Sequence, residues 1–270
     1  MSLNSVEGII GLRQSFRNIR DNIPFLRSMV IRDLKGRYQS TKIGLLWHIV
    51  APAITVVLIY VLFTSLRTYL DPDYWVFIVS GLIPFMFFRN GPSRGSTAIL
   101  SRSGMVKKMA FPRELVVMAQ LIDSLISLSI SYAIMLIVVL MTGHDVPLRC
   151  MLYSVPVIYL SAVFVAGTML IVSSLAVYFR DFQFLINSMA RVMFWVTPVM
   201  FAAESVSGIM STLLAINPVT YYVECFHALV YYGRLPQPET VLMCILFSAA
   251  IFLVGLFVFN RLKGRFAEVL

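Results

Sequence analysis

The chain lacks the motifs that bind nucleotide phosphates. Neither a GxxxxGK[ST] loop nor a GxGxxG turn occurs in its 270 residues, so any ATP-driven work would need a separate polypeptide to hydrolyse the ATP. Cysteine and histidine are also scarce, with three of each and no CxxC spacing. This scarcity indicates neither a disulfide framework nor a metal cluster. We therefore expect no cofactor bound by this chain.

Acidic residues are few as well, with 13 Asp and Glu against 22 Lys and Arg. The one close carboxylate pair is Asp71 and Asp73. Because Pro72 separates them, the pair predicts a turn more readily than a catalytic site. No apolar segment of the signal-peptide type lies near Met1, so we expect no cleaved leader.

Long apolar runs are what the chain does have, since 59% of its residues are hydrophobic. A helix needs about 20 apolar residues to cross a bilayer, and in lipid such runs form helices because no water satisfies an open backbone. The sequence therefore predicts an all-α, polytopic membrane protein with six transmembrane helices. The six runs are 43–66, 74–88, 115–141, 151–177, 182–201 and 240–259, and the second is expected to continue as a polar helix past Arg89.

The cationic residues are sorted by side. If the spans alternate in direction, 18 of the 22 Lys and Arg share one side, the other side holds Arg67, Arg149 and Arg234, and Arg191 lies inside the fifth span. The positive-inside rule then places both termini in the cytoplasm. The net charge of +9 is thus a topology signal and gives no reason to expect a nucleic-acid partner.

The chain divides into a cytoplasmic N-terminal segment (1–42), a membrane domain (43–260) and a cytoplasmic tail (261–270). Between Phe25 and Tyr38 apolar and charged residues alternate at helical spacing. This pattern is typical of an amphipathic helix that lies on a membrane surface.

Four segments carry a resemblance to a known family. They are RDLKGRYQSTKIGLLWHIVAPA (32–53), SGMVKKMAFPRELVVMAQ (103–120), LAVYFRDFQFLIN (175–187), and TPVMF (197–201) followed by NPVTYYVECFHALVYYG (217–233). In order and spacing they resemble the permeases of ATP-binding-cassette exporters of the type 2 class that move polysaccharides. The resemblance covers nearly the whole chain. It departs at His227, where relatives often carry Arg, which leaves a role for that position open.

The resemblance implies a permease subunit of a bacterial plasma or inner membrane. It would pair with a second copy of itself and with two copies of an ATPase subunit, which would hold the ATP and Mg²⁺. The cytoplasmic turns would dock on that ATPase, although their cations could instead fix orientation and bind anionic lipid. The residues expected to couple are Arg32, Lys35, Arg37, Lys107, Lys108, Arg113, Arg180 and Asp181.

Two charges inside the predicted spans need a partner, because a charge in the bilayer centre costs about 2.5 to 3.5 kcal/mol on insertion scales. Asp123 and Arg191 lie at similar depths from the cytoplasmic ends of their spans. We favour a structural ion pair between them over a second interpretation, in which Arg191 contacts a phosphate of a lipid-linked substrate.

Aromatic residues could line a passage, because the C–H faces of sugars pack on aromatic rings. The possible channel aromatics are Tyr60, Phe63, Phe85, Phe88, Phe194 and Trp195, although for each one taken singly we favour helix or lipid packing. Tyr74 and Trp75 are expected to be interfacial anchors. Between 204 and 239, proline residues break the chain into helices expected at 209–216 and 219–232. We expect them to form an external re-entrant hairpin, with Asn217, Pro218, Tyr221, Tyr222 and His227 as its notable residues.

The resemblance predicts a permease that moves a polysaccharide on a lipid carrier, such as O-antigen or teichoic acid, out of the cytoplasm. Exporters of capsule polysaccharide, drugs or small lipids are the nearest alternatives. A membrane-embedded transferase or an ATP-independent carrier would be a different class. The sequence shows neither the clustered Asp, Glu or His of the first nor the paired broken spans of the second.

Overall fold

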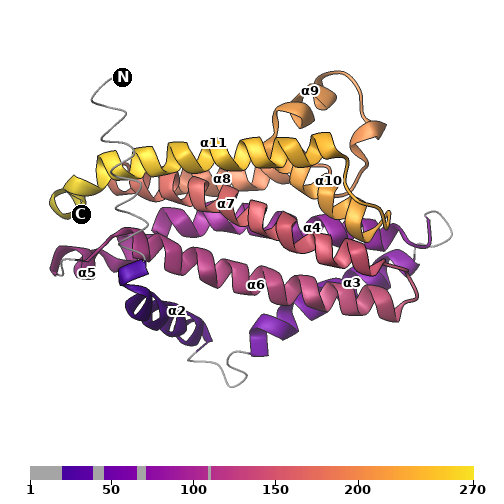
Figure 1. Ribbon diagram of the computed structural model, residues 1–270, viewed down its shortest axis with the longest axis horizontal. Helices are drawn as coiled ribbons and strands as arrows, with labels where there is room; N and C mark the ends of the chain where they lie inside the picture. Colours follow the sequence, from indigo (N-terminus) through magenta and orange to yellow (C-terminus); the bar gives the residue numbers. More distant parts are fainter. Residues whose placement is uncertain (1–19, 39–45, 66–70, 109–110) are drawn as a thin grey trace.

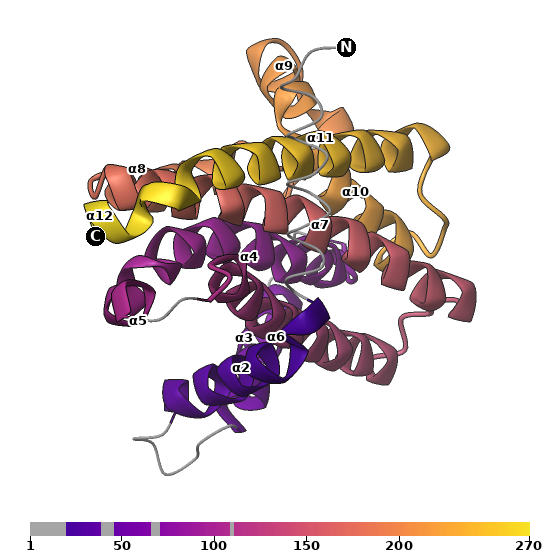
Figure 2. The ribbon, with the colours of Figure 1, turned by 60° about the vertical axis from the view of Figure 1, so that its left-hand side comes forward.

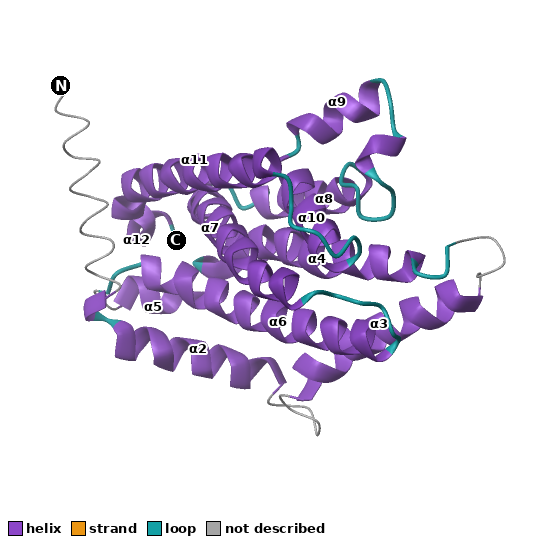
Figure 3. Cartoon of the chain, turned by 45° about the vertical axis from the view of Figure 1, so that its right-hand side comes forward, coloured by secondary structure: helices purple, strands orange, loops and turns teal. Residues whose placement is uncertain are grey.

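The computed structural model describes residues 20–38, 46–65, 71–108 and 111–270, and all regular elements in these ranges are helical (Figures 1 and 3). The α-helices are α2 (Ile23–Tyr38), α3 (Trp47–Ser65), α4 (Tyr74–Ala98), α5 (Ser103–Lys108), α6 (Glu114–Met141), α7 (Leu148–Tyr178), α8 (Phe182–Trp195), α9 (Ile209–Ile216), α10 (Pro218–Val230), α11 (Pro238–Leu262) and α12 (Phe266–Val269). Short 3-10 turns occupy Leu100–Arg102, Ala203–Ser205 and Lys263–Arg265.

The long helices run side by side, so the bundle has two ends (Figure 1). One end carries α5 and α12, and we name it the α5 end. The opposite end carries α10 and the turn between α6 and α7, and we name it the α10 end, from which α9 projects (Figure 1). The all-α prediction is confirmed.

Three helical segments are long and apolar enough to cross a membrane, Glu114–Met141, Leu148–Tyr178 and Pro238–Arg265. Helices α9 and α10 pass the same test together, but they are bent by 88° at their junction. The structure leaves the count of six spans, and the entry of α9 and α10 into the bilayer, as predictions. The expected fifth span is shorter than predicted, because α8 ends at Trp195 and Pro198 follows three residues later.

Glycines bring the central helices into close contact. A Cβ atom on Gly167 of α7 would lie 2.6 Å from the backbone oxygen of Ile251 in α11, so the two backbones touch there. Gly95 of α4 meets Met169 of α7 in the same manner, with a Cβ position 3.0 Å from its Cα. Small residues of this kind let helices pack tightly where hydrophobic burial gives no driving force between them.

Helix α2 packs on the first half of α6 and runs obliquely to it (Figure 2). Its helical span agrees with the predicted amphipathic helix. However, Leu26, Met29 and Val30 are buried in the protein core and do not face outward. The exposed apolar residues of α2 are Ile23 and Ile31. Much of the face that was predicted to meet lipid therefore meets α6, because the N-terminal half of α6 offers an apolar surface of its own.

Candidate functional site

A charged pair joins the C-terminal part of α4 to the first half of α6. Arg94 donates from Nη1 to the Asp123 carboxylate at 2.8 Å and to the Ser124 hydroxyl at 3.0 Å. The Asp123 side chain is fully buried, whereas 28% of the Arg94 side chain is exposed. The guanidinium offsets part of the hydration that the carboxylate loses on burial.

The predicted pairing of Asp123 with Arg191 is therefore wrong. Arg191 lies on the exposed side of α8, where its Nη2 donates to Ser188 Oγ at 3.1 Å. Equal depth was a poor guide because α4 packs against both α6 and α8 and lies between them. The second interpretation of Arg191, contact with a substrate phosphate, stays a prediction.

Beside the Arg94–Asp123 pair lies a cavity of about 240 Å³, which we name the α3–α4–α6 cavity. Its polar lining comes from all three helices. The polar side chains are Thr55, Asn90, Arg94, Ser124, Ser127 and Ser131. Trp47, Phe87 and Leu128 are among its apolar walls.

The α5 end is held together by ion pairs. Asp33 of α2 accepts from Arg102 in the turn before α5, and Gln120 of α6 reaches the same carboxylate at 3.4 Å. Glu114, the buried first residue of α6, accepts from Lys263 near the C-terminus. These contacts fasten α2 and the C-terminal segment to the loop region that contains α5.

The residues predicted to couple to an ATPase divide by exposure. Arg32, Lys107, Arg180 and Asp181 are exposed at the surface. Arg113 is half-buried, with its guanidinium 5.8 Å from the centre of the Phe266 ring. The side chains of Lys35, Arg37 and Lys108 lie outside the described residues. Coupling of these residues to an ATPase stays a prediction. Arg113 also contacts α12, through the Phe266 ring.

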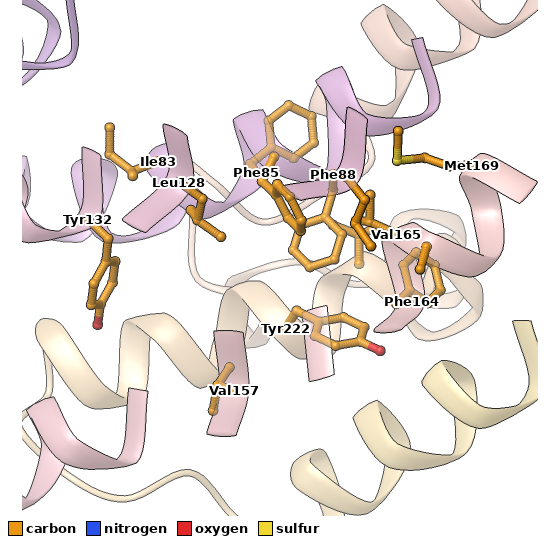
Figure 4. Packing of buried hydrophobic residues seen from close by; sticks show 14 of the residues in the cluster. Ile83, Phe85, Phe88, Leu128, Tyr132, Val157, Phe164, Val165, Met169 and Tyr222 are labelled. Carbon is orange, nitrogen blue, oxygen red and sulfur yellow. The ribbon is translucent and has the colours of Figure 1, made fainter. Parts of the chain in front are cut away.

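The six predicted channel aromatics also differ in how far they are buried. Phe85 and Phe88 are buried in the core, where Phe88 packs against Phe164 and Tyr222 (Figure 4). Both residues therefore serve in helix packing, and the prediction that they line a passage within this chain is wrong. Tyr60, Phe63 and Phe194 are partly buried and each contacts another aromatic ring. Trp195 at the end of α8 is 71% exposed. Of the six, Trp195 faces outward most.

Several side chains at the α10 end form hydrogen bonds between neutral groups. Asn217 caps α10 by accepting from the backbone N–H of Val219 at 3.1 Å, and its amide donates to Thr197 at 2.9 Å. Pro218 follows at the first helical position, where a missing N–H does no harm. The hydroxyl of Tyr221 donates to Ala215 at 2.9 Å, and the buried Tyr222 donates to the carbonyl of Cys244 at 2.9 Å.

His227 is buried in this end of the bundle and has two hydrogen-bond partners. Its Nε2 donates to the Pro198 carbonyl at 3.0 Å, and its Nδ1 lies 2.9 Å from the Ser80 hydroxyl. The imidazole also stacks on Phe77, with ring centres 3.9 Å apart. Gly81 makes room for the ring, since a Cβ there would lie 2.6 Å from it. His227 thus acts as a packed hydrogen-bonding residue.

The sequence did not single out Arg94 or Asn90 as site residues. Arg94 was counted with the cytoplasmic cations, and Asn90 was not considered. The available signal was their spacing of four residues on the predicted polar extension of the second span, which places both on one helix face. The serines at 124, 127 and 131 have the same helical periodicity on α6. Two facing polar stripes predict a polar contact between helices.

The comparisons with known proteins agree over most of the chain. The profile of the family described as "ABC-2 type transporter" matches residues 25–231. The chain is 26% identical over 256 residues to the O-antigen export system permease protein RfbA of Klebsiella pneumoniae, covering 92% of this chain and 97% of that one. It is 26% identical over 245 residues to the protein of the same name from Myxococcus xanthus, with coverage of 90% and 94%. It is 24% identical over 234 residues to the polysialic acid transport protein KpsM of Escherichia coli, with coverage of 86% and 90%.

Proposed function

Because the chain belongs to the ABC-2 type transporter family, we propose that it is the permease subunit of an ATP-driven exporter of a lipid-linked polysaccharide. The observation that carries this proposal is the end-to-end match to O-antigen export permeases, which covers 97% of the Klebsiella protein. A match over the whole length includes the spans, the turns and the external region together. It therefore supports a shared task better than a match to one motif.

The physical features of the chain support the same function. Helices long enough to cross a membrane are present, and no nucleotide-binding motif occurs in the sequence. The energy for transport would then come from ATP hydrolysis on a partner subunit, with Mg²⁺ bound there. The exposed cations Arg32, Lys107 and Arg180 belong to α2, α5 and the turn after α7, and are the surface we assign to that partner.

A second copy of the chain is part of the proposal. Helix α8 exposes a large apolar surface that includes Phe184, Met189 and Val192, and Arg191 lies on the same helix. A guanidinium that faces acyl chains is unfavourable. A second copy placed against α8 would give Arg191 a polar passage to face, through which the glycan would move from the cytoplasmic side to the outside.

Deletion of the gene in its native cells tests the function. We expect the long surface polysaccharide to disappear and its lipid-linked form to accumulate inside, with recovery when the wild-type chain is supplied from a plasmid. Immunoblotting of intact and permeabilised cells for the glycan distinguishes the two pools. Unchanged surface glycan in the deletion strain would refute polysaccharide export.

Capsule polysaccharide is a second candidate substrate, favoured by the 24% identity to the polysialic acid transport protein KpsM. The deletion strain separates the two. Loss of a glycan that is bound to the lipid A core indicates O-antigen, whereas loss of a capsule layer with an intact O-antigen indicates capsule. Loss of resistance to a drug with both glycans intact would point to the drug-exporter alternative.

A further inference from the structure

The α3–α4–α6 cavity has the size of a small-ligand site. Its volume of about 240 Å³ is below the ~300 to 1,000 Å³ of typical pockets for drug-sized ligands, so it suits one ring-sized group. The cavity begins at the level of Trp47, the first residue of α3, and runs along α6 from Ser124 to Ser131. It lies beside the exposed apolar face of α3, which includes Ile54 and Leu58.

The hydroxyl groups of the cavity present acceptors. Thr55 Oγ1 lies 3.0 Å from the Ala51 carbonyl, and Ser131 Oγ lies 2.8 Å from the Ser127 carbonyl. A carbonyl oxygen only accepts, so each hydroxyl donates its proton to its own helix. What each offers to the cavity is an oxygen lone pair, which needs a ligand that donates hydrogen bonds.

Asn90 adds both a donor and an acceptor. Its side chain lines the cavity and makes no hydrogen bond with another described residue. A partly buried amide without a protein partner is unfavourable unless water or a ligand satisfies it. The matching ligand group both donates and accepts, as a hydroxyl does.

The charge of the cavity argues against a phosphate group. Among the described lining residues Arg94 is the one cation, and its guanidinium is already paired with the Asp123 carboxylate at 2.8 Å. A phosphate also lacks the protons that the lone pairs of Thr55 and Ser131 require. By contrast, an uncharged polyol satisfies acceptors and donors together without a net charge.

The remaining walls are apolar and aromatic. Trp47 and Phe87 line the cavity together with Ile83 and Leu128. A pyranose ring has the complementary surface, because its axial C–H groups form an apolar face while its equatorial hydroxyls point to the rim. Polar groups that fix orientation against an apolar wall are the usual composition of a small-molecule site.

We propose that the α3–α4–α6 cavity binds one uncharged sugar residue of the transported glycan, with Asn90, Ser131 and Thr55 hydrogen-bonding its hydroxyls beside Trp47. This inference rests on the proposed function for the identity of the glycan. It assigns to the cavity a recognition role that is separate from the passage through which the chain of sugars moves.

Trp47 gives a direct measurement of binding, because the sequence contains three tryptophans. The variant Trp75→Phe, Trp195→Phe retains Trp47 as the sole indole, and Phe preserves a ring at both replaced positions. The full-length variant in lipid nanodiscs is titrated with the lipid-free oligosaccharide released by mild acid from the cell's own surface glycan. We expect a saturable change in Trp47 emission, and no change with inorganic pyrophosphate.

Two substitutions and a matched control localise the signal. Asn90→Leu and Ser131→Ala each remove hydrogen-bonding groups, and each should weaken saccharide binding about 5- to 10-fold. Ser129→Ala is the control, because Ser129 is exposed two residues away on the same helix and does not line the cavity. It should bind as the parent does. Single-peak elution and an unchanged melting temperature of the variants show that they are folded.

Several results would overturn the sugar site. A response to pyrophosphate alone would identify an anion site, and no response to either probe would leave the cavity without a ligand of this class. Equal weakening by Ser129→Ala would mean that binding occurs elsewhere. If gene deletion removes the surface glycan but the cavity variants bind the saccharide normally, the site fails while the export function stands. If deletion leaves the glycan in place, the export function itself fails.

Discussion

The two ends of the bundle are held by different chemistry. At the α5 end, the ion pairs Asp33–Arg102 and Glu114–Lys263 join segments far apart in the sequence. At the α10 end, the long-range contacts of the buried His227 and Tyr222 are neutral hydrogen bonds and ring stacking, and the carboxylate contact there, between His144 and Asp73 at 3.3 Å, involves an exposed Asp73 side chain. Neutral contacts avoid the desolvation of charge that a membrane environment makes unfavourable, whereas ion pairs suit a region reached by water.

This difference has a mechanical consequence. An ion pair can exchange one charged partner for another as segments shift, so these pairs suit a region that must move when a partner subunit closes. A buried neutral network loses its hydrogen bonds if it opens, and it therefore resists motion. We infer that movement enters at the α5 end while the α10 end keeps its shape.

The largest loss of stability is expected at the glycine contact between α7 and α11. Gly167→Leu places a side chain where a Cβ alone would be 2.6 Å from the Ile251 oxygen, and we expect a loss of about 3 kcal/mol or more of stability. Folded protein after detergent extraction, measured by size-exclusion chromatography, should fall sharply. Gly104→Leu at the α5 end is the control, since no atom lies within 4 Å of its Cβ position. Equal yields of the two variants would contradict the tight α7–α11 contact.

The next effect is at the α10 end. His227→Leu keeps much of the ring's volume but leaves the Pro198 carbonyl and the Ser80 hydroxyl without their partner, which should lower stability by about 2 to 3 kcal/mol. Thermal unfolding in detergent measures the loss, and the loss should be the same at low and high salt. Ser80→Ala removes one of these contacts and should have the smaller effect. A strong salt dependence of the loss would contradict a neutral network.

A smaller effect is expected at the α5 end. Asp33→Arg or Arg102→Asp alone places like charges together and should lower stability by about 1 to 2 kcal/mol, less at high salt. The charge-swapped double variant should recover most of the loss, because the two side chains contact each other directly. Thermal unfolding at two salt concentrations tests both statements. If the double variant shows the sum of the single losses, Asp33 and Arg102 do not act as a pair.

The sequence predicted the elements well where one physical rule dominates. Apolar length and the positions of proline gave helices α6, α7, α9, α10 and α11 close to their observed limits, whereas α8 ends before the predicted limit. The Asp71–Asp73 turn is confirmed by a hydrogen bond from the backbone of Asp73 to the Asp71 carboxylate at 2.9 Å. The Asn217–Pro218 start of α10 followed from the same local rules. Such features depend on neighbours along the chain.

The sequence could not predict which helix faces meet. Asp123 pairs with Arg94 and not with Arg191 because α4 lies between α6 and α8, and depth along a span carries no information on rotation about its axis. The burial of Phe85 and Phe88 likewise depends on which face of α4 meets its neighbours, and position along the span does not show this. The α3–α4–α6 cavity needs three helices to be placed before its polar side chains can be seen as one group.

The smallest effect on stability should come from the exposed cations of the α5 end, where we expect the largest effect on partner binding. Lys107→Glu and Arg180→Glu alter exposed side chains, so unfolding should change by less than about 0.5 kcal/mol. Affinity purification from native cells should nevertheless recover less of the ATPase. Arg113 is unsuitable for this test, because its contact with Phe266 would confound docking with the packing of α12.

Arg149→Glu provides the matched control, because it makes the same charge change on an exposed residue in the first turn of α7, the helix that begins at the α10 end. Its ATPase recovery should equal that of the wild-type chain. If Arg149→Glu releases the ATPase as strongly as Lys107→Glu, the loss reflects net charge and not a docking surface. Release that is confined to Lys107→Glu and Arg180→Glu would place the ATPase at the α5 end, where the ion pairs that can rearrange are found.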